Sequence, residues 1–257
     1  MDGLAAFGAA VVAAGLLAAY LLVGEPLVGT VLHRRFEAAL GHDRGARLWL
    51  YRRLLVLEWG LVALVAGVVL VAPLGWSDLG LRLPDASPTV LAVAIALFVL
   101  SFLVLSTGMV RTAARRDRHD APALGSASPS VTALVPRTRV ERRWFGLVAV
   151  SAGVCEEVLY RGFLLGVVVA VLPGLPALGL VVLGGLIFGL AHAYQGATGI
   201  ATTAVLGAIL TYLYVGTGTL LVPIVVHAAI DLRILWLPLD ALPPDPAQRG
   251  SAGSAPA

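Results

Sequence analysis

Seven ionisable side chains interrupt the apolar C-terminal part of the sequence, between Trp144 and Trp236. They are Glu156, Glu157, Arg161, His192, His227, Asp231 and Arg233. An ionisable group deep in a bilayer costs about 2.5–3.5 kcal/mol on insertion scales, so such a group calls for a functional reason. Carboxylates and imidazoles are the groups that most often move protons in catalysis. This set therefore has the chemistry of a general acid–base site.

The spacing within the first part of the set predicts which side chains meet. Glu157 and Arg161 are four residues apart, so on a helix they share a face and can form an ion pair. Glu156 is rotated by about 100° from that face and is left without a counter-ion. A buried acid without a counter-ion is a candidate general base. The Glu157–Arg161 pair itself also fits a purely structural role.

The histidines divide into two groups by their surroundings. His227 and Asp231 are four residues apart, so the acid can bind the imidazole, fix its tautomer and raise its basicity. The alternatives are a hydrogen bond that only locks the helix and, for His192, a position at the membrane interface. The remaining histidines lie in charged stretches and are expected to be solvated. These are His33, His42 and His119.

Long apolar stretches must position these residues. Of the 257 residues 59% are apolar and 13% are charged, and the mean hydropathy is +0.92. Soluble domains average about 25% charged residues, so the composition excludes a soluble enzyme, a disordered protein and a disulfide scaffold. It predicts an all-α fold, a polytopic integral membrane helical bundle with about seven (six to eight) transmembrane helices.

Seven stretches meet or approach the roughly 20 apolar residues that a helix needs to cross a bilayer. They run from Leu4 to Val23, Leu54 to Leu74, Thr89 to Val110, Trp144 to Leu172, Leu175 to His192, Thr198 to Val215 and Leu220 to Leu237. The stretch from Val28 to Tyr51 mixes charged and apolar residues and is expected to hold a short interfacial helix.

The same pattern divides the chain into four parts. We expect N-terminal transmembrane spans at 1–110 and a cytoplasmic Arg-rich linker with an interfacial helix at 111–143. The core that carries the ionisable set follows at 144–237. The Pro-, Ala-, Gly- and Ser-rich tail at 238–257 is expected to be disordered.

The basic residues, all of them Arg, predict how the chain crosses the membrane. They concentrate in the first and third loops, which the positive-inside rule places in the cytoplasm. The first loop holds Arg34, Arg35, Arg44, Arg47, Arg52 and Arg53, and the third holds Arg111, Arg115, Arg116, Arg118, Arg137, Arg139, Arg142 and Arg143. We therefore expect a multi-pass protein of the plasma membrane whose ionisable set lies toward the cytoplasmic side. The basic charge is attributed to this topology and not to a nucleic-acid partner.

Three short motifs resemble those of the CPBP family, which contains CAAX proteases and bacteriocin-processing enzymes and is also called Abi. The run from Glu156 to Arg161 resembles its EExxxR motif. Phe188 and His192 are similar to its FxxxH motif, and His227 with Asp231 to its HxxxN or HxxxD motif. The motifs occur in order at family-like spacing, over roughly residues 136–237.

The resemblance implies an all-α intramembrane endopeptidase that hydrolyses peptide bonds of membrane-associated peptide or protein substrates. It implies Glu156 as the base that activates water, assisted by His192. It assigns stabilisation of the oxyanion to His227 and Asp231, and support of the site to Glu157 and Arg161.

The resemblance leaves the metal requirement open, because the family has been described both as glutamate-dependent and as a family of metalloproteases. Two histidines and two acids can hold Zn²⁺, although no HExxH pair is present. The ligands of the metal-dependent alternative are Glu156, His192, His227 and Asp231.

One residue departs from the prenyl-protein proteases of the family, which carry Asn where this chain has Asp231. An ionised Asp cannot donate to an oxyanion, whereas Asn can. Asp231 is therefore protonated, orients His227 or ligates a metal, and we favour the last two roles.

Two other functions compete with peptide hydrolysis. A non-proteolytic immunity or partner-binding protein on the same scaffold would not need the intact motif residues. An ion-coupled transporter would be expected to show broken helices or repeat symmetry, and neither is evident in the sequence. The endopeptidase is the favoured interpretation.

Overall fold

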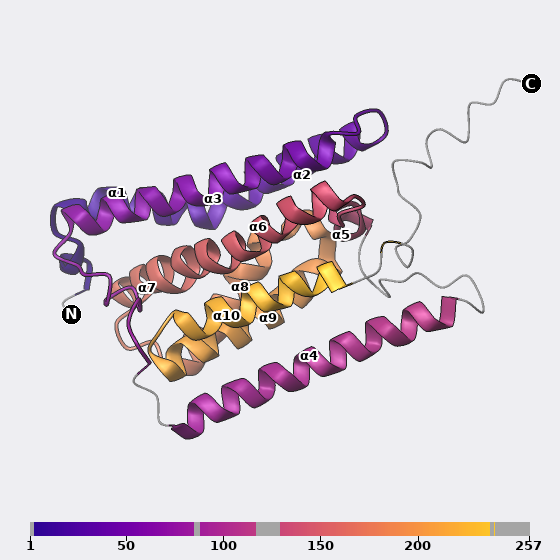
Figure 1. Cartoon of the computed structure of the whole chain (residues 1–257). Coiled ribbons are helices and arrows are strands. Elements are labelled where there is room, and N and C mark those ends of the chain that lie inside the picture. The colour runs from indigo at the N-terminus through magenta and orange to yellow at the C-terminus, as the bar shows by residue number, and fades with distance from the viewer. Residues whose placement is uncertain (1–2, 85–87, 117–128, 237–238, 240–257) are drawn as a thin grey trace, which may run out of the picture.

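The computed structural model describes residues 3–84, 88–116, 129–236 and 239, and every regular element within them is helical (Figure 1). The first half contains η1 (Gly3–Ala10), α1 (Val11–Ala19), the π-helix η2 (Tyr20–Gly24), α2 (Glu25–Leu40), α3 (Ala46–Val71) and α4 (Pro88–Arg116). The second half contains α5 (Pro129–Leu134), α6 (Arg139–Glu156), the π-helix η3 (Glu157–Leu164), α7 (Leu165–Val171), α8 (Ala177–Ala191), η4 (Ala193–Gln195), α9 (Gly196–Thr217), α10 (Leu221–Leu232) and η5 (Arg233–Trp236).

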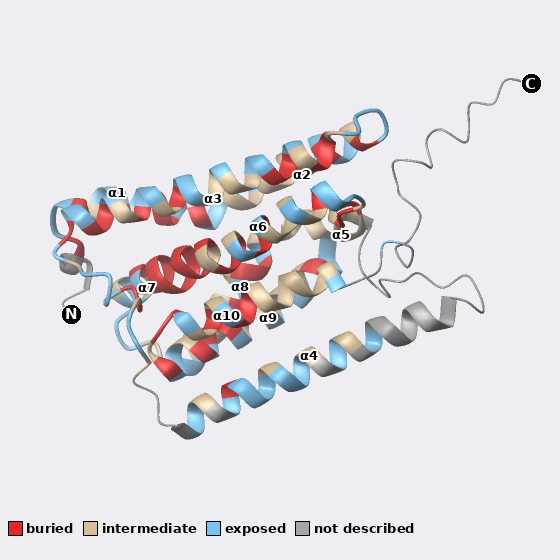
Figure 2. Ribbon diagram, in the orientation of Figure 1, coloured by how far each residue is buried: buried red, intermediate tan, exposed pale blue. Residues whose placement is uncertain are grey.

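The helices run side by side along one axis, and most of the buried residues follow η3 and the helices around it (Figures 1 and 2). Large apolar side chains on the outside stay exposed, such as Leu16 on α1 and Leu70 on α3, which are 69% and 79% exposed. A helix that is apolar on its outer face as well fits a hydrocarbon environment, where its backbone groups are already bonded within the helix. The expected all-α membrane fold is confirmed.

The expected count of seven spans stays a prediction. Within the described residues, four helical segments are long and apolar enough to cross a membrane. They are Phe7–Leu40, Ala46–Val71, Thr89–Ser106 and Ala193–Thr217. Helix α8 is apolar but shorter, and α10 has only 12 residues. The segment from α6 to α7 carries Glu156, Glu157 and Arg161, so its composition is less apolar.

The first helical segment is longer than the sequence indicates. After a kink at Gly8, whose φ and ψ are not helical, it continues through α1, η2 and α2 to Leu40. The whole segment Phe7–Leu40 has 34 residues. The charged stretch from Val28 to Tyr51 was expected to form a separate interfacial helix. Its first part, as far as Leu40, instead forms the end of this segment. Glu25 and His33 are thereby carried into the bundle, and His33 is buried at 5% exposure. The expectation that His33 is solvated is wrong, because its ring lies against the Tyr194 ring with centroids 4.9 Å apart.

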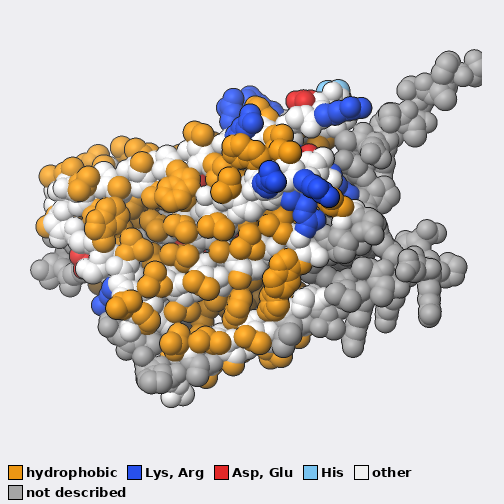
Figure 3. Space-filling view, in the orientation of Figure 1, with side chains coloured by type: hydrophobic (Ala, Val, Ile, Leu, Met, Phe, Trp, Pro, Cys, Tyr) orange, Lys and Arg blue, Asp and Glu red, His pale blue; other side chains and the backbone are white. Residues whose placement is uncertain are grey.

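His42 is exposed, as expected. His119 and Arg118 lie outside the described residues, and so does the expected disordered tail except for Leu239. The basic side chains visible in Figure 3 gather mainly toward one end of the molecule, over the α2–α3 connection and the start of α6. At that end Arg52 of α3 lies over the Trp144 ring of α6, at 4.9 Å from its centroid. The two Arg-rich loops of the described chain therefore share one end of the bundle.

Candidate active site

The paired glutamates lie where an α-helix changes into a π-helix. Helix α6 begins with a reciprocal capping box between Thr138 and Glu141 and ends at Glu156, and η3 starts at Glu157. A π-helical segment inside a longer helix is rare and occurs mostly at functional sites. Here it separates the environments of two adjacent acids, because Glu157 is fully buried whereas the Glu156 side chain is 18% exposed.

Beneath the site, Glu157 and Arg161 form the ion pair that the four-residue spacing predicts. Arg161 Nη1 donates to Glu157 Oε1 at 2.8 Å, and Arg161 Nη2 donates to the Gly207 carbonyl of α9 at 3.1 Å. The guanidinium carbon lies 4.3 Å from the centroid of the Phe188 ring. Two hydrogen bonds and a ring face offset the cost of burying this charge, so the pair fixes η3 against α8 and α9.

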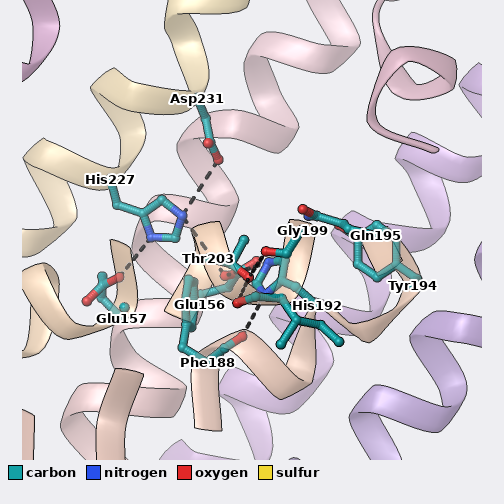
Figure 4. Close-up of polar contacts among 12 residues, drawn as sticks. Glu156, Glu157, Phe188, His192, Tyr194, Gln195, Gly199, Thr203, His227 and Asp231 are labelled. Atoms are coloured by element: carbon teal, nitrogen blue, oxygen red, sulfur yellow. Dashed lines mark hydrogen bonds and ion pairs between the residues drawn. The ribbon is translucent and has the colours of Figure 1, made fainter. Parts of the chain in front are cut away.

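His227 is oriented by Glu157. Its Nδ1 donates to Glu157 Oε1 at 2.8 Å, which leaves Nε2 directed toward Glu156 (Figure 4). Asp231 Oδ2 lies 3.7 Å from the same Nε2, which is too long for a hydrogen bond. The four-residue spacing thus brings Asp231 close to the ring, but the bond that fixes the ring comes from another helix.

A close approach of two helices makes that bond possible. A Cβ atom added at Gly153 of α6 would lie 2.8 Å from the backbone nitrogen and from the Cβ of Ala228 on α10. Only a residue without a side chain fits there, and small residues let neighbouring membrane helices come together in this way. Gly153 therefore brings the helix of His227 against the helix of the glutamates.

His192, at the end of α8, presents the same ring nitrogen as His227. Its Nδ1 donates to the Phe188 carbonyl at 2.9 Å, and its Nε2 lies 3.9 Å from Glu156 Oε2. His227 Nε2 lies 4.0 Å from the same oxygen. A backbone contact at Gly189, where a Cβ would be 2.7 Å from the Ile200 carbonyl oxygen, sets α8 against α9. Glu156, His192 and His227 are thus brought together as the motifs predict.

The distances from Glu156 Oε2 to the two imidazole nitrogens fit a bridging water molecule. Separations near 4 Å are too long for direct hydrogen bonds, and they are the separations that one bridging water spans. Glu156 Oε2 is buried and has no hydrogen-bond partner among the described residues. A carboxylate and two imidazole nitrogens that converge in this way can bind a water molecule and take its proton.

The site opens into a cavity of about 270 Å³ whose lining also comes from α2 and α3. Glu156, His192, His227 and Asp231 line it, together with Glu25, Glu58, His33 and many apolar side chains. Neither Glu25 nor Glu58 is among the residues that the motifs predict. Glu58 could have been found, because it is the only charged residue of the apolar stretch Leu54 to Leu74, whereas Glu25 lies between two such stretches and gives no such signal.

The metal-dependent alternative requires that the donors around Glu156 have the geometry of a metal site. In the described part of the chain, no group of three His, Cys, Asp or Glu residues has a geometry that could hold a metal ion. The donor set expected for Zn²⁺ converges on the cavity, but its members do not form such a group. The proposed use of Zn²⁺ by these residues therefore stays a prediction.

Comparison with known families agrees with the motifs. Residues 140–233 match the family described as type II CAAX prenyl endopeptidase Rce1-like. The matched segment contains both glutamates, Arg161, both histidines and Asp231, and it confirms the family resemblance. No curated protein and no solved structure matches the chain.

Proposed function

We propose that this protein is an intramembrane endopeptidase of the CAAX type, in which Glu156 activates a water molecule. The observation that carries the proposal is the convergence on Glu156 Oε2 of His192 Nε2 at 3.9 Å and His227 Nε2 at 4.0 Å. The match of residues 140–233 to a peptidase family supports it independently of the geometry.

The reaction needs one water, one base and one group that stabilises negative charge. Glu156 accepts a proton from the water while the water oxygen attacks the carbonyl carbon of the scissile bond. The C–N bond of the tetrahedral intermediate then breaks, and the proton on Glu156 passes to the leaving nitrogen. The products are one carboxyl and one amine terminus, and Glu156 returns to its starting form.

The imidazoles supply position and charge. His192 and His227 each have Nδ1 engaged, with the Phe188 carbonyl and with Glu157, so each ring has a fixed orientation with Nε2 toward the water. When protonated, His227 can donate through Nε2 to the developing oxyanion, and the Glu157 carboxylate stabilises that cationic ring. Asp231 adds negative charge at the rim of the cavity.

A peptide-cleavage screen with protein purified in detergent tests the proposal. Glu156→Gln keeps the volume and removes the base, so cleavage should fall by about 10²–10⁴-fold while the protein stays folded. Asp43→Asn is the control, because Asp43 is exposed in the α2–α3 connection and does not line the cavity. Cleavage by Glu156→Gln at the wild-type rate would contradict the assignment, and no cleavage of any peptide by wild type would favour a binding protein.

The metal-assisted alternative has its own measurement. Metal analysis of the purified protein, with activity assays before and after a chelator and after restoring Zn²⁺, separates the two mechanisms. Activity that survives complete removal of metal supports the mechanism written above. Activity that returns only with Zn²⁺ would assign a metal to the donor set of the cavity.

The proposal places the site toward the cytoplasmic side of a plasma membrane, since both Arg-rich loops share the end of the bundle where α8 ends at His192. Single cysteines at His42 and Ser77, introduced into a Cys155→Ala background, test this because both positions are exposed and lie at opposite ends of α3. Labelling of the first only from inside and of the second only from outside is expected. The reverse pattern would put the site on the outer side.

A further inference from the structure

The cavity contains more carboxyl groups than hydrolysis requires. Glu156 and Asp231 come from the matched segment, and Glu25 and Glu58 reach the cavity from α2 and α3. Glu58 interacts electrostatically with each of the other three. Four acids that repel one another in a small apolar space are costly to keep, so they need a compensating partner.

The described lining offers Glu25 and Glu58 no Lys or Arg as a partner. The Oε2 atoms of both are buried without a hydrogen-bond partner, and no Lys or Arg is among the described lining residues. Two of the three imidazoles of the cavity are next to other acids, since His33 Nε2 lies 3.2 Å from Glu37 and His227 Nδ1 is bonded to Glu157. The third, His192, interacts electrostatically with Glu25, and its Nδ1 is bonded to the Phe188 carbonyl.

Acids without a Lys or Arg counter-ion next to a reacting centre have a direct use if the substrate brings the cation. A guanidinium or an ammonium group forms charge-assisted hydrogen bonds with carboxylates, and an Arg fork can bind two oxygens at once. A metal ion is the other candidate cation, but no group of three acids and histidines in the described chain has metal-site geometry. A basic side chain is the cation that a peptide carries.

We propose that Glu25 and Glu58 bind a basic side chain, Arg or Lys, of the peptide substrate beside the scissile bond. The inference rests on the proposed peptidase function and names a substrate class for it. The cavity of about 270 Å³ lies near the lower end of the size range of ligand pockets, so it admits only a few side chains around the bond that is cut. A basic residue among them would lie within reach of both acids and would neutralise part of their charge.

The experiment uses a library of N-acetylated apolar peptides in detergent. Each peptide has a single Arg, Lys, Gln or Glu, which is moved through every position in turn. At the best position, wild type should cleave the Arg and Lys peptides with a kcat/KM about 10–100-fold above that for Gln. Glu58→Gln should bring the ratio toward one, mainly through KM. Asp43→Asn, the control outside the cavity, should keep the ratio. Equal cleavage of the Arg and Gln peptides, or an unchanged ratio in Glu58→Gln, would overturn the inference.

Folding of the variant is checked in the same preparation. Glu58→Gln removes a repelling carboxylate, so its melting temperature in detergent should match or exceed that of wild type. A lower melting temperature would overturn the inference, because an acid that holds the fold together is not reserved for a ligand. Glu25→Gln is the second variant and should also reduce the preference for Arg.

A binding measurement separates this inference from the peptidase function. The Glu156→Gln protein should bind the Arg peptide about tenfold more tightly than its Gln counterpart, and Glu156→Gln combined with Glu58→Gln should lose the difference. Tight binding of the Arg peptide without cleavage by wild type would contradict the peptidase and keep the cation site. Glu156-dependent cleavage with equal binding of both peptides would support the peptidase and contradict the cation site.

Discussion

The cavity has two walls that treat their charged groups differently. Behind the wall formed by η3 and α10, Glu157 Oε1 is bonded to Arg161 and to His227, each at 2.8 Å, although Glu157 Oε2 and Arg161 Nε have no hydrogen-bond partner. On the wall formed by α2 and α3, Glu25 and Glu58 each keep a buried oxygen without a partner. Buried charges that are paired with each other give a region one stable arrangement, whereas buried acids without a counter-ion are kept at the expense of stability. We therefore call the first the satisfied wall and the second the open wall. In the proposed mechanism the first wall holds the reacting groups in place, and in the proposed substrate preference the second wall binds a basic side chain.

The largest expected effect is on the satisfied wall. Glu157→Gln leaves Arg161 buried without its counter-ion, so the free energy of unfolding should fall by about 3–5 kcal/mol. Thermal unfolding in detergent measures this. Adding Arg161→Met to Glu157→Gln removes the stranded charge and should restore most of the loss. Wild-type stability in the single variant would show that the two walls do not differ.

The next effect concerns the helix contact that aligns this wall. Gly153→Ala places a methyl group 2.8 Å from the backbone of Ala228, so α10 must shift and stability should fall by about 1–3 kcal/mol. Activity should fall too, because His227 moves with α10. Gly67→Ala on α3 is the matched control, since a Cβ there has no neighbour within 4 Å and should leave stability unchanged or higher. Equal effects of the two substitutions would refute the role of the close contact.

The sequence predicts the satisfied wall well, because its residues stand in motifs with helical spacing. The Glu157–Arg161 pair follows from a four-residue repeat, and the structure has it at 2.8 Å. The bond between Glu157 and His227 joins positions 70 residues apart, so no local pattern indicates it. The π-helix at Glu157 has no periodicity signal either, since it depends on how η3 packs in the bundle.

The open wall is harder to predict. Glu25 and Glu58 stand alone in their spans, without a partner at helical spacing, and the charges after Glu25 favour an interfacial interpretation of that stretch. Only the depth of a helix in the bundle decides whether a lone acid faces a cavity or the membrane surface. That depth follows here from the continuation of the first helical segment past Val23 to Leu40, which the composition does not indicate.

A smaller effect is expected at the rim between the two walls, at Asp231. Loss of a carboxylate that orients a catalytic histidine costs roughly 10–100-fold in activity. Because Glu157 holds His227 Nδ1 and Asp231 lies 3.7 Å from Nε2, Asp231→Asn should reduce activity by at most about tenfold. The loss is measured from the activity of wild type and of Asp231→Asn over a range of pH, with and without a chelator. A larger loss that follows the loss of bound metal would assign Asp231 to a metal ligand set.

The smallest effect tests the open wall by stability alone. Glu25→Gln keeps the shape of the side chain and removes one of four repelling acids, so the free energy of unfolding should rise by about 0.5–1 kcal/mol. The gain should be lower than that of Glu58→Gln, because the Glu25 carboxyl also accepts a hydrogen bond from Tyr20, which the substitution weakens. The melting temperatures of Glu25→Gln and Glu58→Gln in the same detergent show which variant gains more stability. Destabilisation by Glu25→Gln on the scale expected for Glu157→Gln would mean that α2 contributes a structural charge, and the difference between the two walls would disappear.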